Sequence, residues 1–180
     1  MRFLHVSDIH YDPERDGHSA RSLRKYLPAF IRERNLKADE LFVTGDYRHA
    51  PSQKDAPEEQ TAESAAEYIW EIAGAAGITE AEHIHLAPGN HDRRRSEGDA
   101  AKRYEDIEKA YDCAKGTFSA ADLEFLKSEF SFFFAVCGRL YGEKNPWADR
   151  PLHRYEVLGD HILLTLNTAV MHVRGDSRGG

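Results

Sequence analysis

Cysteine is scarce in this sequence: its 180 residues include only Cys113 and Cys137. Two thiols cannot supply the disulfide framework that holds many small secreted domains together. The chain also lacks an apolar run of about 18 residues, the length that a membrane-spanning helix needs. Its first residues reach Asp8 before the apolar region of a signal peptide could form, so we expect a cytoplasmic location and no membrane partner.

The sequence also lacks an excess of basic residues. It has 24 Lys and Arg against 31 Asp and Glu, which gives a formal net charge of −7. Such a chain is not expected to bind nucleic acid or a membrane surface through bulk charge, although a bound metal ion can reverse the sign locally. Hydrophobic residues make up 41% of the chain, enough to bury a core. The length favours one domain, spanning residues 1–180.

Strand and helix patterns alternate over the first half of the chain. Apolar runs predict strands at 2–7, 40–44 and 83–87, and helical segments are expected between them at 19–35 and 58–76. This alternation is typical of βαβ units, in which the strands are parallel and the crossovers right-handed. The sequence therefore predicts an α/β fold built on a parallel sheet.

The second half of the chain has a different pattern. Residues 99–113 and 119–138 are predicted to be helical, with Ser119 as the N-cap of the second helix. Apolar residues at helical spacing within 119–138 indicate a core face rather than a ligand site. Two strands, 152–158 and 161–168, then flank a Gly-Asp turn signal and predict a β-hairpin.

Polar residues follow each of the three predicted parallel strands. They are Asp8-Ile9-His10, Gly45-Asp46 and Gly89-Asn90-His91-Asp92. The carboxyl ends of parallel strands meet at one edge of a sheet, where ligands bind, so these segments are expected to converge. Each segment alone is weak evidence, because such residues are common on surfaces and in turns. Their order and their common place at strand ends favour a functional site over three unrelated polar turns.

The first two segments suit a metal site. Asp8 and His10 are two residues apart, so they are expected to project to the same side of extended backbone and to form a chelating pair. Gly45 permits the sharp turn that lets Asp46 reach the sheet edge. A carboxylate such as that of Asp46 has two oxygens and can bridge two cations.

The third segment adds a further oxygen ligand and a proton donor. Pro88-Gly89 suits the centre of a type II turn, which would present Asn90 and His91 outward. Asn90 offers a neutral carbonyl oxygen, and His91 could donate a proton or a hydrogen bond to a reacting group. Asp92 could orient the His91 imidazole.

Together these motifs resemble the calcineurin-like metallophosphoesterase superfamily. The resemblance covers residues 1–92 through specific motifs and continues more weakly through the hairpin and Leu166-Asn167-Thr168. It implies a four-layer αββα sandwich, of which this chain carries mostly the N-terminal half. Residues 93–150 then form a helical insertion.

The resemblance also implies a centre of two divalent metal ions: Mn, Fe or Zn, with Mn favoured. Asp8 and His10 would hold the first ion. Asp46 would bridge both ions, and Asn90 would hold the second. His91 would protonate or stabilise the leaving group while a hydroxide that bridges the metals attacks phosphorus.

Two motifs of the superfamily do not follow in recognisable form: a further metal-binding His and a Gly-His-x-His motif. His172 is isolated, and the sequence ends at Gly180. We therefore expect the N-terminal part of a longer protein, with a complete but catalytically silent protein as the alternative. His49 or His172 could take a vacant ligand position. The hairpin is expected to cover only part of the inner sheet face and to leave Leu163 or Leu164 short of partners, which makes self-association possible.

The expected function is metal-dependent hydrolysis of a phosphodiester or phosphomonoester. A small phosphodiester or nucleotide is favoured over long nucleic acid, because the net charge is −7 and no basic segment interleaves with aromatics. The alternatives are a nuclease of the same superfamily and a silent metal-binding or regulatory module. His49 could line the phosphate site, and Arg93 could contact the substrate phosphate. His83 and His85 are expected to be structural.

Overall fold

A computed structural model describes residues 1–11, 18–48, 58–94, 99–110, 118–149 and 152–170 of the chain. His49 and His172, which the sequence analysis names as possible ligands, lie outside these described residues.

Three parallel strands form the sheet that carries the predicted site residues. They are β1 (Phe3–Ser7), β2 (Glu40–Thr44) and β3 (Ile84–Ala87), paired in the order β1-β2-β3. The crossover helices are α1 (His18–Glu33) and α2 (Glu58–Ala76). Leu41 and Val43 of the central strand are fully buried, as expected of an apolar run with a strand on each side. The predicted parallel βαβ arrangement and the α/β class are confirmed.

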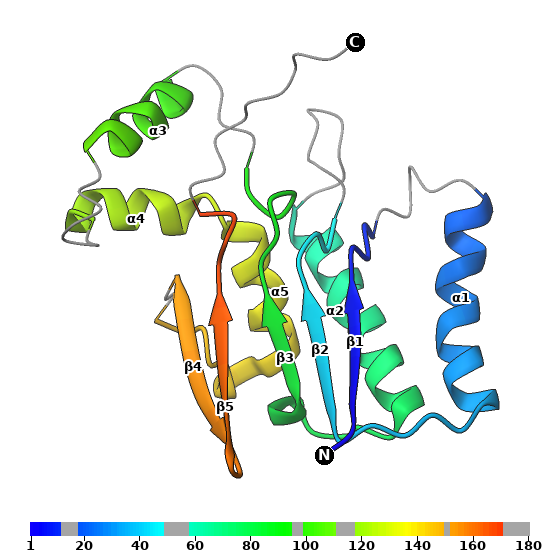
Figure 1. Ribbon diagram of the computed structural model, residues 1–180. Coiled ribbons are helices and arrows are strands. Elements are labelled where there is room, and N and C mark those ends of the chain that lie inside the picture. The colour runs from blue at the N-terminus through cyan, green and yellow to red at the C-terminus, as the bar shows by residue number, and fades with distance from the viewer. Residues whose placement is uncertain (12–17, 49–57, 95–98, 111–117, 150–151, 171–180) are drawn as a thin grey trace.

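Helices cover one face of this sheet (Figure 1). α2 and α5 (Ser131–Tyr141) lie behind the strands and pack against each other, and α1 packs against α2. The hydrophobic core fills the space between the strands and these helices, with Ile69 of α2 and Phe133 of α5 both fully buried. None of the helices in the described residues is long and apolar enough to cross a membrane.

The described residues of the insertion between 93 and 150 are largely helical, as predicted. The first expected helix, 99–113, is present over residues 99–110, whereas the second is divided in two. The helices in the described residues are α3 (Asp99–Ala110), α4 (Ala120–Ser128), α5 and a 3-10 turn at Gly142–Lys144. Ser119 caps α4 as predicted, because its hydroxyl accepts a hydrogen bond from the Asp122 N–H at 3.1 Å. The single helix expected over 119–138 is wrong, since the chain turns at Glu129 and Phe130.

This turn allows α5 to be buried on several sides. Phe132, Phe133 and Val136 are each 0% exposed. A straight continuation of α4 would bury only one apolar stripe, because α4 has exposed residues on its other face. The Glu129 carbonyl also accepts a hydrogen bond from the Arg94 N–H at 2.8 Å, which joins the turn to the segment after β3.

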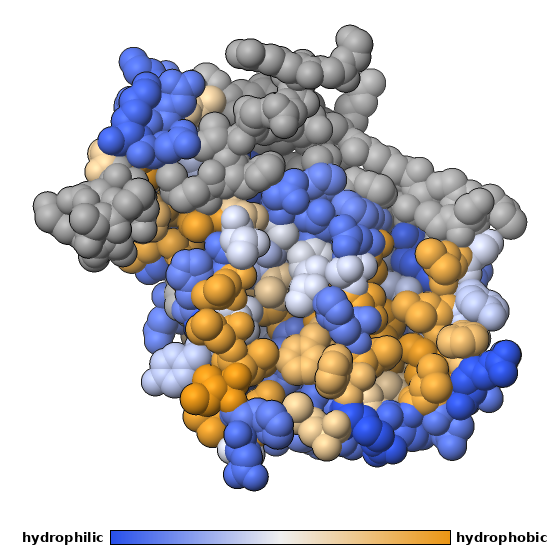
Figure 2. Space-filling view, viewed as in Figure 1, coloured by the Kyte–Doolittle hydropathy of each residue, from blue (hydrophilic) through white to orange (hydrophobic). Residues whose placement is uncertain are grey.

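The predicted hairpin is present, but it lies beside the parallel sheet. It comprises β4 (His153–Leu158) and β5 (His161–Leu166), which are antiparallel. β5 contacts β3 and lies next to it, with β4 outermost (Figure 1). The hairpin therefore continues the row of strands, whereas it was expected to cover part of the inner sheet face. Apolar side chains gather over the strands on this side of the molecule (Figure 2). Of the two leucines expected to lack packing partners, Leu164 is 61% exposed and Leu163 is half-buried. Self-association through this surface stays a prediction.

Phe133→Ala tests the packing of α5 behind the sheet. The Phe133 ring contacts the rings of Tyr47, Phe134 and Trp147, so its removal leaves a cavity. We expect the free energy of unfolding to fall by about 3–5 kcal/mol. Leu23→Ala is the control, because Leu23 is 66% exposed and its removal should change stability by less than about 1 kcal/mol. Urea unfolding measures the free energy of unfolding of both variants. A similar loss of stability in Phe133→Ala and Leu23→Ala would contradict the packing of α5 behind the sheet.

Candidate metal centre

Backbone hydrogen bonds hold together the loops that follow β1, β2 and β3. The Asp8 N–H donates to the Gly45 carbonyl at 3.3 Å, and the His10 N–H donates to the Asp46 carbonyl at 2.9 Å. The Gly45 N–H in turn donates to the Ala87 carbonyl at 2.7 Å. Three segments that are far apart in the sequence therefore meet at one sheet edge, as the parallel topology predicts.

Several residues in these loops have left-handed backbone. The φ angles are 55° at Asp8, 43° at His10, 74° at Gly45 and 53° at Asp46. The sharp turn predicted at Gly45 is confirmed. The expectation of extended backbone from Asp8 to His10 is wrong, because β1 ends at Ser7 and the chain turns to bond with the β2 loop. Such strain persists only where surrounding contacts enforce it, and it clusters at functional sites.

The loops after β2 and β3 approach each other most closely at Gly89. A Cβ atom at Gly89 would overlap both the Asp46 Oδ1 and the Asp46 backbone nitrogen. Gly89 is not among the described residues with positive φ, so the type II turn expected at Pro88-Gly89 is wrong. Glycine is needed here for space rather than for a left-handed backbone.

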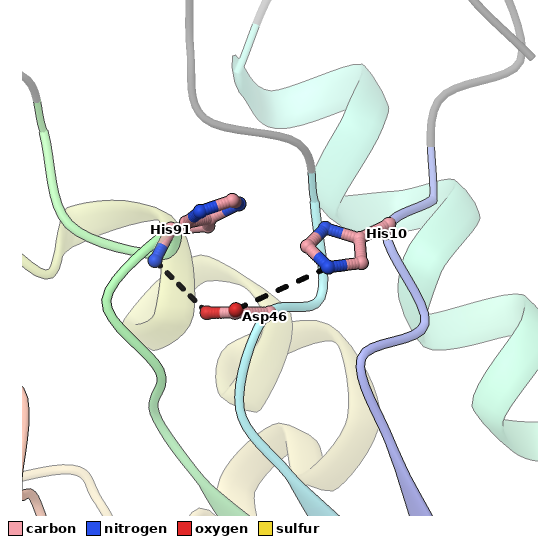
Figure 3. Close-up of side chains that lie close together, drawn as sticks. All are labelled: His10, Asp46 and His91. Carbon is pink, nitrogen blue, oxygen red and sulfur yellow. Dashed lines mark hydrogen bonds and ion pairs between the residues drawn. The ribbon is translucent and has the colours of Figure 1, made fainter. Parts of the chain in front are cut away.

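Asp46 lies at the centre of the candidate site. Its Oδ1 accepts the His91 backbone N–H at 2.9 Å, and its Oδ2 lies 4.0 Å from His10 Nε2 (Figure 3). Asp8 Oδ1 lies 3.8 Å from the same His10 nitrogen. One possible ligand atom from each of His10, Asp46 and His91 lies within 4.8 Å of the other two. Imidazole nitrogens and carboxylate oxygens at this spacing suit a divalent transition metal.

A cavity of about 510 Å³ opens beside these side chains. Its lining includes Asp8, Asp46 and Asn90, together with residues 163–166 of β5 and Thr168. The exposed Asn90 thus shares the cavity with two of the carboxylates. The structure therefore brings all four predicted metal ligands to one edge, with His91 beside them. Their roles as ligands remain predictions.

Asp92 links the β2 and β3 loops from inside the protein. It is fully buried, and its two carboxylate oxygens accept the backbone N–H groups of Tyr47 and Gly89, both at 2.8 Å. Burial raises the pKa of the Asp92 carboxyl to about 7, against the lowering effect of these two donors. Its predicted role in orienting His91 stays a prediction, since both of its oxygens already bond to the backbone.

Arg93 is buried in a way that the sequence does not predict. It is 8% exposed, and its guanidinium lies 4.2 Å from the centre of the Tyr104 ring on α3. A cation over an aromatic ring is favourable, and this contact joins α3 to the segment after the site. The position supports a packing role; contact between Arg93 and a substrate phosphate stays a prediction.

Arg48 supports the site although no motif in the sequence predicts it, and it lies only two positions after Asp46. Its guanidinium lies 4.1 Å from the centre of the Phe132 ring, and it donates to the His91 carbonyl at 3.4 Å. A second, long hydrogen bond reaches the Asp92 carbonyl at 3.5 Å. Arg48 therefore holds the His91-Asp92 backbone against α5, and its place just after a Gly-Asp pair is the only signal in the sequence.

Gly89→Ala tests the close approach of the two loops. The added methyl group must displace Asp46, so we expect a loss of about 1–3 kcal/mol in stability and weaker binding of Mn²⁺. Gly74→Ala is the matched control, because nothing lies within 4 Å of a Cβ at Gly74 of α2. That variant should be neutral or gain up to about 1 kcal/mol. Unchanged Mn²⁺ affinity in Gly89→Ala, measured by calorimetry, would contradict the role of this contact.

Comparison with known proteins identifies the family. The model of one family, calcineurin-like phosphoesterase, matches residues 1–173. No significant match was found among curated proteins. Proteins of this family typically bind divalent metal ions and hydrolyse phosphoesters, which agrees with the grouping of His10, Asp46 and His91. Because the match covers nearly the whole sequence, the chain belongs to the calcineurin-like phosphoesterase family.

Proposed function

We propose that the chain hydrolyses an ester bond of a small phosphodiester or nucleotide at the edge where β1, β2 and β3 end. The observation that carries this proposal is the convergence of three loops, which brings ligand atoms of His10, Asp46 and His91 within 4.8 Å of one another. Membership of the family supports metal-dependent phosphoester hydrolysis in general.

The side chains at this edge fit divalent metal ions. Asp8 and His10 would hold one ion and Asn90 a second, and the central Asp46 carboxylate would bind to either or both. Oxygen donors outnumber nitrogen donors in this set, which favours Mn²⁺ over Zn²⁺. When bound, such ions polarise phosphoryl oxygens and lower the pKa of water.

His91 is proposed to donate a proton to the oxygen of the leaving group. Its backbone N–H is bonded to Asp46 Oδ1, and its ring centre lies 5.0 Å from that of His10. The ring is thus held beside the Asp46 carboxylate. Imidazole is suited to this work because it gains and loses a proton near neutral pH.

The cavity supports a small substrate over a nucleic acid. Its lining residues in the described part of the chain include no lysine or arginine, and the net charge of the protein is −7. A long polyanion needs several phosphate contacts to basic groups, whereas a single phosphoester can be held by the metal ions. The volume of about 510 Å³ lies within the usual range for small-molecule sites.

A comparison of two substrates tests this function. The full chain with Mn²⁺ is assayed on bis(p-nitrophenyl) phosphate and on a single-stranded oligonucleotide. We expect a higher kcat/KM for the small diester. Preference for the oligonucleotide would favour a nuclease. Bound metal without turnover of either substrate would favour a silent binding module.

Asp46→Asn tests the central carboxylate. The substitution keeps the shape of the side chain and an oxygen that can accept the His91 N–H, but it removes the charge shared between two ions. We expect a larger loss of Mn²⁺ affinity and stoichiometry than in His10→Ala, which removes a ligand of one ion. Asp160→Asn in the exposed hairpin turn is the control and should bind as the original chain does. Calorimetry measures the Mn²⁺ affinity of each variant. If Asp46→Asn and His10→Ala both bind Mn²⁺ as tightly as the original chain, the proposed metal site is contradicted.

His91→Gln separates proton donation from metal binding. A proton donor contributes about 10²–10⁴-fold to the rate, so turnover should fall by that factor while the bound Mn²⁺ is retained. Esters with poor leaving groups should lose more activity than activated aryl esters. An equal loss for both kinds of ester, accompanied by loss of metal, would make His91 a ligand instead.

A further inference from the structure

A buried polar cluster lies where the hairpin meets the parallel sheet. His85 of β3 is only 4% exposed. Its Nδ1 lies 2.6 Å from Glu156 Oε1 of β4, and its Nε2 lies 2.8 Å from Glu40 Oε2 of β2. One imidazole ring therefore contacts both the hairpin and the parallel sheet, and its face stacks on Phe42 at 4.9 Å.

These two contacts require a ring that donates from both nitrogens. A neutral imidazole has a single N–H, and an ionised carboxylate can only accept, so two carboxylates at hydrogen-bonding distance call for the imidazolium form. Glu156 is kept ionised by a second cation, since Arg154 Nη2 lies 2.8 Å from its Oε2. Glu40 has a second neighbour too, because His83 Nδ1 lies 3.2 Å from its Oε1.

The surrounding charges agree with this assignment. Burial lowers the pKa of His85, but the hydrogen bonds to Glu156 and Glu40 outweigh it and hold the pKa above the usual 6.5. Burial raises the pKa of Glu156, but His85 and Arg154 outweigh it, and the pKa is lowered. From the helical side, Tyr141 of α5 donates to the Ile84 carbonyl at 2.6 Å; burial raises its pKa well above the usual value, so it stays neutral.

At this cluster, side-chain contacts join the β4–β5 hairpin to the parallel sheet. β3 and β5 belong to separate sheets in the described residues, so no ladder of backbone hydrogen bonds joins them. Residues 163–166 of β5 nevertheless line the same cavity as Asp46 and Asn90. We call residues 163–166 the β5 wall of the cavity. Its position depends on the contacts that hold the hairpin against the parallel sheet.

We propose that His85 is a positioning residue that fastens the β4–β5 hairpin to the parallel sheet through Glu156 and Glu40, and so holds the β5 wall beside the candidate metal centre. The link depends on pH. It is complete between the ordinary pKa of glutamate, about 4.3, and pH 6.5, where both carboxylates are ionised and the imidazolium is present. It is lost as the pH rises through the elevated pKa of His85 in the folded state. This inference does not rest on the proposed function, because it concerns the position of β5 without substrate or metal.

Nuclear magnetic resonance on the full chain with ¹⁵N-labelled histidine tests the protonation. We expect both ring nitrogens of His85 to carry protons at pH 6 and the ring to titrate above pH 6.5. Glu156→Gln keeps the size of the side chain but removes its charge, and should shift the titration of His85 to lower pH. A single neutral tautomer of His85 at pH 6 would overturn the proposal.

Amide hydrogen exchange tests the fastening itself. In His85→Gln, the β5 protection factors at pH 6 should fall by about tenfold, the scale of a lost charge-assisted hydrogen bond, while those of β1 and β2 change little. The pH dependence of β5 protection above pH 6.5 should also disappear. His161→Gln makes the same substitution at an exposed position of β5 and should leave protection unchanged. Equal protection in the two variants, or an equal loss in β1, β2 and β5, would overturn the positioning role.

Discussion

The close approach of Gly89 to Asp46 is the constraint on which the candidate site depends. No side chain fits at Gly89, because its Cβ would overlap the oxygen and the backbone nitrogen of Asp46. This approach allows Asp46 Oδ1 to accept the His91 N–H, and so it sets the imidazole beside the carboxylate. A sheet edge with the same side chains but a wider gap between its loops would not gather them around one position.

The strained loops are supported by buried groups behind them. Burying a carboxylate is costly unless it accepts hydrogen bonds. Both oxygens of Asp92 accept hydrogen bonds from backbone N–H groups of the two loops. Arg48 lies between this backbone and Phe132, so α5 contributes directly to the support. Tyr47, next to Asp46, packs on Phe133 of the same helix. The helical layer therefore stabilises the positions of the site residues as well as the sheet.

Local patterns predicted much of the fold, and tertiary contacts account for what they missed. The strand 40–44 and the helix 58–76 have the predicted bounds, because an apolar run and an Ala-rich stretch carry strong local signals. The break at Glu129 carries none, since the helical spacing of apolar residues continues across it. The convergence of the predicted metal ligands followed from the parallel topology. The backbone angles of Asp8 and His10, the need for glycine at position 89 and the contacts of Arg48 depend on neighbouring loops and helices, which local patterns do not reveal.

Anomalous X-ray diffraction from crystals of the chain grown with Mn²⁺ would show whether metal ions bind around Asp46. The measurement locates manganese without relying on activity or on any variant. We expect anomalous peaks on both sides of the Asp46 carboxylate, one next to Asp8 and His10 and the other next to Asn90. Saturating Mn²⁺ that gives no peak at this sheet edge, or ordered manganese only elsewhere on the protein, would contradict this expectation.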